Sequence, residues 1–242
     1  MHSPLLHINF DDYVALERKT LQCIKNSIEA KKLPLDESNM KRDINISQYH
    51  NAKGLFDFST HWFIDSFGRN KKSCQILLGE IVRASNGKEI DSISSMLCMS
   101  DGIPGQMLRK IHFDYATAPE KKSHPVFHAQ FAGNLSLYLK KMGFTDDHVV
   151  HLFPDIEEPR IIHYPMPLAY LFELVFREFY PFNIRCQKAG QVQKFREDGT
   201  WINHLKEVEG RILCPYFDSL SKTISSTTQK HTLFDFMYPR LT

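Results

Sequence analysis

The sequence lacks the features that place a protein in a membrane or outside the cell. No apolar run approaches the roughly 18 residues that a membrane-spanning helix needs. The N-terminus has no basic region followed by a long apolar stretch, so it is not a secretory signal. The 5 cysteines are odd in number, widely spaced and without a Cys-x-x-Cys pair, which supports neither a disulfide framework nor a zinc ribbon. A cytoplasmic protein with reduced thiols is therefore expected.

The chain also has almost no excess charge. Lys and Arg total 30 and Asp and Glu total 28, which gives a net charge of +2 and no general electrostatic reason to bind nucleic acid. Basic pairs occur at 71–72, 109–110, 121–122 and 140–141. Scattered pairs of this kind are typical of solvated loops, so DNA contact, if it occurs, is expected to be local or indirect.

Several enzyme signatures are absent. The chain contains no Gly-x-x-x-x-Gly-Lys and no Gly-x-Gly-x-x-Gly, so nucleotide hydrolysis by this chain alone is not predicted. It has no Gly-x-Ser-x-Gly, and no cysteine has a histidine in its local sequence. What the chain has in quantity is aromatic residues, with 18 Phe and 9 Tyr. They predict an aromatic core or an adhesive interface.

Helical periodicity predicts an N-terminal helix from Asp11 and Asp12, as caps, to about Lys32. Its apolar stripe consists of Tyr13, Leu16, Leu21, Ile24 and Ile28, and the opposite side carries Glu17, Arg18, Lys19, Lys25 and Glu29. One narrow stripe suits a helix that docks on its own domain or on a partner. A polar connector follows, so residues 1–36 are predicted to form a helical segment and residues 45–242 an α+β domain.

From residue 54 the pattern changes to short alternating runs separated by turn sequences. The runs at 55–65, 74–83, 90–99, 107–116 and 125–133 predict strands, and 160–163 predicts a brief one. Short connections favour an antiparallel sheet, here of about five to seven strands. Helices are predicted at 134–142, 167–180 and 200–213, with Pro215 kinking or ending the last, and a loop at 219–228. The predicted fold is α+β, with the 167–180 helix packed on one face of the sheet and helices at both ends.

Polar residues interrupt the apolar pattern of the hairpin formed by 107–116 and 125–133. Strand alternation puts Ile111, Phe113 and Tyr115 on one face. If the apolar faces of the two strands match, the other face carries His112 and Asp114 together with His128 and Gln130. With His124 they supply ligand types for a divalent metal or for acid–base chemistry. A hydrogen-bonded structural network is the competing interpretation, since histidines four apart on a strand do not converge as they do on a helix.

The middle of the chain resembles a known family. His124-Pro-x-x-His128 is followed by Pro159-Arg160-Ile161, a Pro-x-Pro entry and a helix ending in Phe179-Tyr180. Over about residues 107–182 this pattern resembles an uncharacterised bacterial family from mobile-element and antiviral defence gene clusters. Length and architecture resemble the small accessory subunit of Lamassu-type systems, which accompanies an SMC-like ATPase and a nuclease. The resemblance implies a non-catalytic protein partner in defence against phage or plasmids, and brings no catalytic residues or cofactor to transfer.

Two functional hypotheses follow. The first is an interaction subunit without catalytic residues or cofactors of its own, whose terminal helices dock on partner proteins such as an SMC-like ATPase and a nuclease. The second is a small metal-dependent hydrolase, acting on nucleic acid through His112, Asp114, His124 and His128. The first is favoured because no complete catalytic motif occurs in the sequence.

Overall fold

A computed structural model describes residues 6–33, 54–67, 72–84, 88–100, 107–116, 127–130, 161–179 and 187–225. The described strands form one sheet of 6 strands in the order β1-β2-β3-β4-β5-β6, with every neighbouring pair antiparallel. For β1 to β4 this meander is the simplest outcome of strands joined by short connections. The strands are β1 (Leu55–Phe67), β2 (Lys72–Arg83), β3 (Ser92–Ser100), β4 (Met107–Ala116), β5 (Phe127–Gln130) and β6 (Ile161–Ile162).

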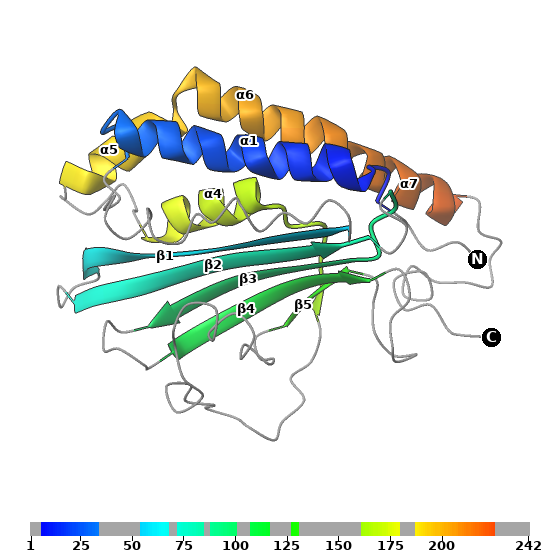
Figure 1. Cartoon of the computed structure of the whole chain (residues 1–242), viewed down its shortest axis with the longest axis horizontal. Helices are drawn as coiled ribbons and strands as arrows, with labels where there is room; N and C mark the ends of the chain where they lie inside the picture. Colours follow the sequence, from blue (N-terminus) through cyan, green and yellow to red (C-terminus); the bar gives the residue numbers. More distant parts are fainter. Residues whose placement is uncertain are drawn as a thin grey trace.

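The helices gather on one side of the sheet (Figure 1). α4 lies next to the strands, and α1, α6 and α7 form the outer layer above it. The helices are α1 (Phe10–Glu29), α4 (Leu168–Phe179), α5 (Gln187–Arg196), α6 (Gly199–Val208) and α7 (Cys214–Ser225), with a π-helical turn at Glu209–Leu213. The predicted α+β class, with an antiparallel sheet, a packed amphipathic helix and helices towards both ends, is confirmed. Among the described residues, no helix has both the length and the apolar character that crossing a bilayer requires.

The register of the sheet explains where the core lies. On β2, Ile76, Leu78 and Val82 alternate towards the helices and join the main hydrophobic core. The core continues onto α4, whose Leu168, Leu171, Phe172, Val175 and Phe176 are fully buried. Side chains of the other sheet face are buried as well, including Leu77, Met96 and Cys98. Both faces of the central strands are thus withdrawn from solvent.

α1 begins differently from the prediction. Asn9 is its N-cap and accepts a hydrogen bond of 2.8 Å from the backbone N–H of Asp12, while Asp11 and Asp12 lie in the first turn. Asn is as good a cap as Asp, and carboxylates in the first turn favour the helix dipole. The five residues of the predicted apolar stripe are all buried. The stripe packs within this chain, and the expected division between 1–36 and 45–242 falls in residues 34–53, outside the described residues.

The C-terminal helices correct a second expectation. The helix does not end at Pro215. A π-helical turn at Glu209–Leu213 precedes the proline, Cys214 N–H bonds to the Glu209 carbonyl, and α7 continues to Ser225. The π-helical turn accommodates Pro215, which has no N–H to donate, so the helix passes through the proline. The predicted loop at 219–228 is therefore wrong for 219–225, which are helical, and the predicted helix at 134–142 lies outside the described residues.

Glu173 of α4 holds the outer helices in place. Its side chain is buried and accepts hydrogen bonds from Arg177 at 2.8 Å, from Arg196 at 2.7 and 3.0 Å, and from the indole N–H of Trp201 at 3.0 Å. Burial alone would raise the pKa of Glu173, but the bonds from Arg196, Trp201 and Arg177 outweigh it and lower the pKa. One carboxylate thereby orients α5 and α6 against α4, and so places α6 beside α1.

Candidate binding groove

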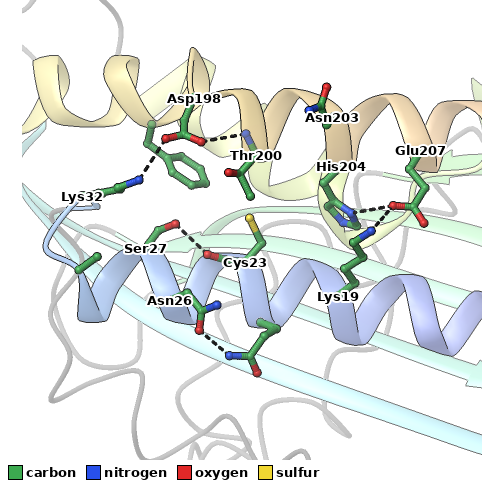
Figure 2. A pocket seen from close by; sticks show the side chains of 13 residues that line it. Lys19, Cys23, Asn26, Ser27, Lys32, Asp198, Thr200, Asn203, His204 and Glu207 are labelled. Carbon is green, nitrogen blue, oxygen red and sulfur yellow. Dashed lines mark hydrogen bonds and ion pairs between the residues drawn. The ribbon is translucent and has the colours of Figure 1, made fainter.

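A groove of about 700 Å³ runs between α1 and α6 (Figure 2). Its volume lies within the range of about 300–1,000 Å³ that small-ligand sites occupy. One wall comes from the second half of α1 and the other from the end of α5 and from α6. The groove is lined by Lys19, Gln22, Cys23, Asn26, Ser27, Lys32, Phe195, Asp198, Thr200, Asn203, His204 and Glu207, among others.

Ion pairs close the groove at both ends. Lys19 of α1 bonds to Glu207 of α6 at one end, and Lys32 bonds to Asp198 at 3.1 Å at the other. The hydrogen bond from Lys19 is the main cause of the lowered pKa of Glu207. The pKa of Asp198 is lowered first by the hydrogen bond from the Thr200 N–H and then by the bond from Lys32. Both carboxylates are therefore ionised at neutral pH. All four charges have partners inside the groove.

His204 is buried at the Lys19 end. Its Nε2 lies 2.7 Å from the hydroxyl oxygen of Thr20, whose own proton is donated to the Leu16 carbonyl at 3.1 Å. The Thr20 oxygen must then accept, which fixes the proton of the neutral imidazole on Nε2 and leaves a lone pair on Nδ1. Burial, followed by the charge of Lys19, lowers the pKa of His204, so the ring is neutral at pH 7. Nδ1 lies 3.9 Å from Glu207 Oε2.

Cys23 lies half-buried in the groove between Thr200 and His204 (Figure 2). Burial, and then the charge of Asp198, raise the pKa of the Cys23 thiol. A thiol needs a lowered pKa and a base at its sulfur to act as a nucleophile. Here His204 Nε2 is bonded to Thr20, and Nδ1, which carries the lone pair, has no hydrogen-bond partner among the described residues, so neither nitrogen holds the thiol. A cysteine, a histidine and a carboxylate share the groove, but their arrangement suits binding rather than covalent catalysis.

Carboxamides occupy both walls. Gln22 Nε2 donates to Asn26 Oδ1 at 2.5 Å, which leaves the Gln22 oxygen and one Asn26 N–H pair available. Asn203 is exposed on the opposite wall, and its side chain forms no hydrogen bond within the described part of the chain. The groove thus offers uncharged donors and acceptors on both sides.

The predicted histidine–aspartate cluster lies on the other face of the sheet. The register pairs His112 with Gln130 and Asp114 with His128, while Phe113 and Tyr115 oppose Ala129 and Phe127 on the helix side. The predicted alternation is therefore confirmed. His112 is buried, and Asp114 accepts a bond of 2.6 Å from Ser94. His124 and the side chain of His128 lie outside what the structure describes, and among the described residues no three His, Cys, Asp or Glu side chains are grouped to hold a metal.

A second polar cluster joins α1, the sheet and α4. Glu80 of β2 accepts hydrogen bonds of 3.0 Å from both Tyr13 and Ser95, and Glu17 accepts one of 3.3 Å from the first N–H of α4, at Leu168. Both carboxyl groups are fully buried, and one oxygen of each has no hydrogen-bond partner within the described residues. Burial raises the pKa of Glu80 to about 8; burial and the charge of Glu80 raise that of Glu17.

The placement of Glu17 on the exposed side of α1 was wrong. Glu17 follows Tyr13 by four residues and precedes Leu21 by four, so helical geometry puts all three on one face. That spacing was the available signal. The pairing of Cys23 with His204 in one groove had no signal, because about 180 residues separate them and helix packing alone brings them together.

Comparisons with known proteins do not identify the chain. No protein-family model matches the sequence, and no curated protein or solved structure matches it. The fold and the groove define the class as an α+β protein with a polar interhelical groove, and function must be inferred from the residues themselves.

Proposed function

We propose that the protein is a non-catalytic accessory subunit of a cytoplasmic bacterial defence complex against phage or plasmids. In this role it bridges or stabilises an SMC-like ATPase and an effector nuclease. The observation that carries the proposal is the groove between α1 and α6, which leaves uncharged donors and acceptors available beside the bonds that join the two helices. The sequence pattern of residues 107–182 supports the choice of complex.

A pair of exposed aromatic rings supports a role in protein interaction. Tyr164, which precedes α4, and Phe217 of α7 are 38% and 46% exposed, and their ring centroids lie 6.2 Å apart. Tyrosine and other aromatics are enriched in protein interfaces because they bury a large area at low entropic cost. His163 stacks on Tyr164 at 4.2 Å and extends the aromatic surface inwards.

Purification of the tagged full-length protein from its native host tests the proposal. We expect an ATPase and a nuclease to co-elute with the protein in size-exclusion chromatography at constant stoichiometry. The double variant Tyr164→Ser with Phe217→Ser, which adds no charge, should reduce co-elution while circular dichroism stays unchanged. Elution as a free monomer, with full phage and plasmid protection in a strain that lacks both partners, would contradict the proposal.

One observation favours a second candidate function, a small metal-dependent hydrolase. The register places Asp114 opposite His128, with His112 one pair further along on the same face. Elemental analysis of the purified protein, together with defence assays of His128→Ala and Asp114→Ala, tests this candidate. Stoichiometric metal that both substitutions remove would support it, and full protection by both variants without bound metal would eliminate it.

A further inference from the structure

The two edges of the sheet differ in length. β6 forms one edge with 2 residues, whereas β1, the outermost strand at the other edge (Figure 1), has 13 residues. Among the described elements, only β2 pairs with β1. A short edge strand offers few backbone groups to another chain, but a long one offers a row of N–H and C=O groups. The outer side of β1 is therefore a place where a further strand can join the sheet.

The register shows which backbone groups of β1 face outwards. The Ala84 N–H donates to the Gly54 carbonyl at 2.8 Å, and these two residues extend the register in which Leu55 lies opposite Arg83. Hydrogen-bonded pairs of an antiparallel ladder recur at every second residue. The even-numbered residues of β1 therefore bond to β2, while the odd-numbered residues from 55 to 63 direct their N–H and C=O groups away from it. The register stays regular as far as Ile64, so about ten backbone groups line this edge.

β1 lacks the features that keep an edge strand from pairing. Natural edge strands are protected by shortness, by proline or lysine, or by a bulge that twists the edge away. The sequence of β1 contains no Pro, Lys or Arg, and its register shift lies beyond Ile64, near the end of the strand. Residues 55–64 thus form an uninterrupted edge of roughly 30 Å at about 3.3 Å per residue.

The residues of β1 complement a second copy of the same strand. Two copies that pair antiparallel around a two-fold axis bring their outward-facing, odd-numbered positions opposite one another. With the axis at Ser59, Asp57 lies opposite His61 and Leu55 lies opposite Phe63. An acidic residue then meets a histidine, and an apolar residue meets another apolar residue, which are cross-strand combinations that stabilise a sheet.

Neighbouring registers match less well. An axis one residue to either side places Leu55 opposite His61 or Asp57 opposite Phe63. An axis two residues to either side places Asp57 opposite Asp57, or His61 opposite His61, and like charges directly opposite each other are destabilising. The order of residues along β1 therefore favours a single register.

We propose that two copies of this protein associate by antiparallel pairing of β1 with β1 around a two-fold axis at Ser59. The two sheets become one continuous sheet, and about ten backbone hydrogen bonds join the copies, a number typical of a specific interface. The inference goes beyond the proposed function and does not depend on it, because it concerns how the protein associates with itself.

Disulfide trapping tests the register. Opposite residues that exchange hydrogen bonds have Cα atoms about 5.5 Å apart, which lies within the range of roughly 4.4–6.8 Å that a disulfide spans. Ser59→Cys should therefore form a disulfide between two copies on mild oxidation, identified by mass spectrometry of the linked peptides. The matched control is Ser66→Cys on the same strand, whose two copies would lie about 45 Å apart in this register and should not link to each other.

A proline substitution tests the backbone pairing. The N–H of Ser59 faces away from β2, so Ser59→Pro leaves that ladder intact but removes a donor at the centre of the proposed interface. Light scattering should give twice the mass of one chain for wild type and for Ser59→Ala, which keeps the N–H. It should give the mass of one chain for Ser59→Pro. Circular dichroism checks that all three proteins are folded.

A wild-type protein that stays monomeric at its highest soluble concentration would overturn the inference. Linking of Ser66→Cys as efficient as that of Ser59→Cys, or a folded dimer of Ser59→Pro, would also overturn it. If Ser59→Pro does not fold, the disulfide comparison decides. None of these outcomes bears on co-elution with an ATPase and a nuclease, so the proposed function is tested separately.

Discussion

The buried carboxyl groups at the junction of α1 and the sheet predict an unusual dependence of stability on pH. Glu80 is fully buried, and its pKa of about 8 in the folded protein compares with about 4.3 for a glutamate in an unfolded chain. Between these values the folded state holds a proton that the unfolded state has released. The contribution of Glu80 to stability is therefore fully present below about pH 4.5 and is lost as the pH rises from there through about 8.

The magnitude follows from proton linkage. Each such group lowers the free energy of unfolding by about 1.4 kcal/mol per pH unit within the window. Glu17, whose pKa is also raised, adds to the same slope. Glu80→Gln preserves an oxygen that accepts from Tyr13 and Ser95 and places a neutral amide where the protonated oxygen was, so it should remove the Glu80 part of the slope. The variant should be more stable than wild type at pH 8 and close to it at pH 5.

Urea unfolding at pH 5, 6, 7 and 8, followed by tryptophan fluorescence and circular dichroism, measures the slope. The control is Glu29→Gln, which removes an exposed carboxylate from α1 and should leave the slope unchanged. Parallel pH profiles for wild type and Glu80→Gln would refute the reasoning, because they would show that Glu80 is equally ionised in the folded and unfolded states.

Four further predictions concern stability, each measured by urea unfolding. Gly54 has φ of +58°, and an added Cβ would lie 2.0 Å from a backbone carbonyl oxygen. Gly54→Ala should therefore lower the free energy of unfolding by about 1–3 kcal/mol. Gly190 lies on α5 with open space around it, so Gly190→Ala should raise the free energy of unfolding by about 0.5–1 kcal/mol. Glu173→Ala leaves Arg196 and the Trp201 indole without their acceptor and should lower the free energy of unfolding by about 3–5 kcal/mol. Glu173→Gln, which keeps an acceptor oxygen, should lower it by less. Equal losses for the two variants would contradict the role given to the hydrogen bonds of Glu173. Lys19→Ala should cost about 1 kcal/mol or less and lose its effect at high salt, because its pair with Glu207 is exposed.

The sheet could be predicted because each signal was local. Alternation with period two and short turn sequences define an antiparallel hairpin, and the same alternation placed His112 and Asp114 on the face away from Phe113. α4 was equally clear, since its apolar residues recur at helical spacing and are buried. In these strands and in α4, which side chains are buried can be read from the pattern of apolar residues within about one helical turn or one pair of strands.

The remaining features depend on tertiary contacts. α5 buries Val192 and Phe195 but is otherwise polar, so it carries almost no amphipathic signal and was not predicted. The helical state of 219–225 overrides the weak helix preference of serine and threonine, because α7 anchors itself through Tyr216. The groove was hidden for the same reason, since its two walls come from opposite ends of the chain.

The π-helical turn before α7 also determines how this protein can change over evolution. A π-helical turn contains one residue more than an α-helical turn, and the wider turn takes up that residue while the helical segments on either side stay in phase. Insertion of one further residue within Glu209–Leu213 has no such turn to absorb it and would rotate α7 by about 100° relative to α6. Phe217 would then leave Tyr164, and Tyr216 would leave Phe127, on which its ring now packs at 4.9 Å. The length of this turn therefore fixes which face of α7 meets Tyr164 and Phe127.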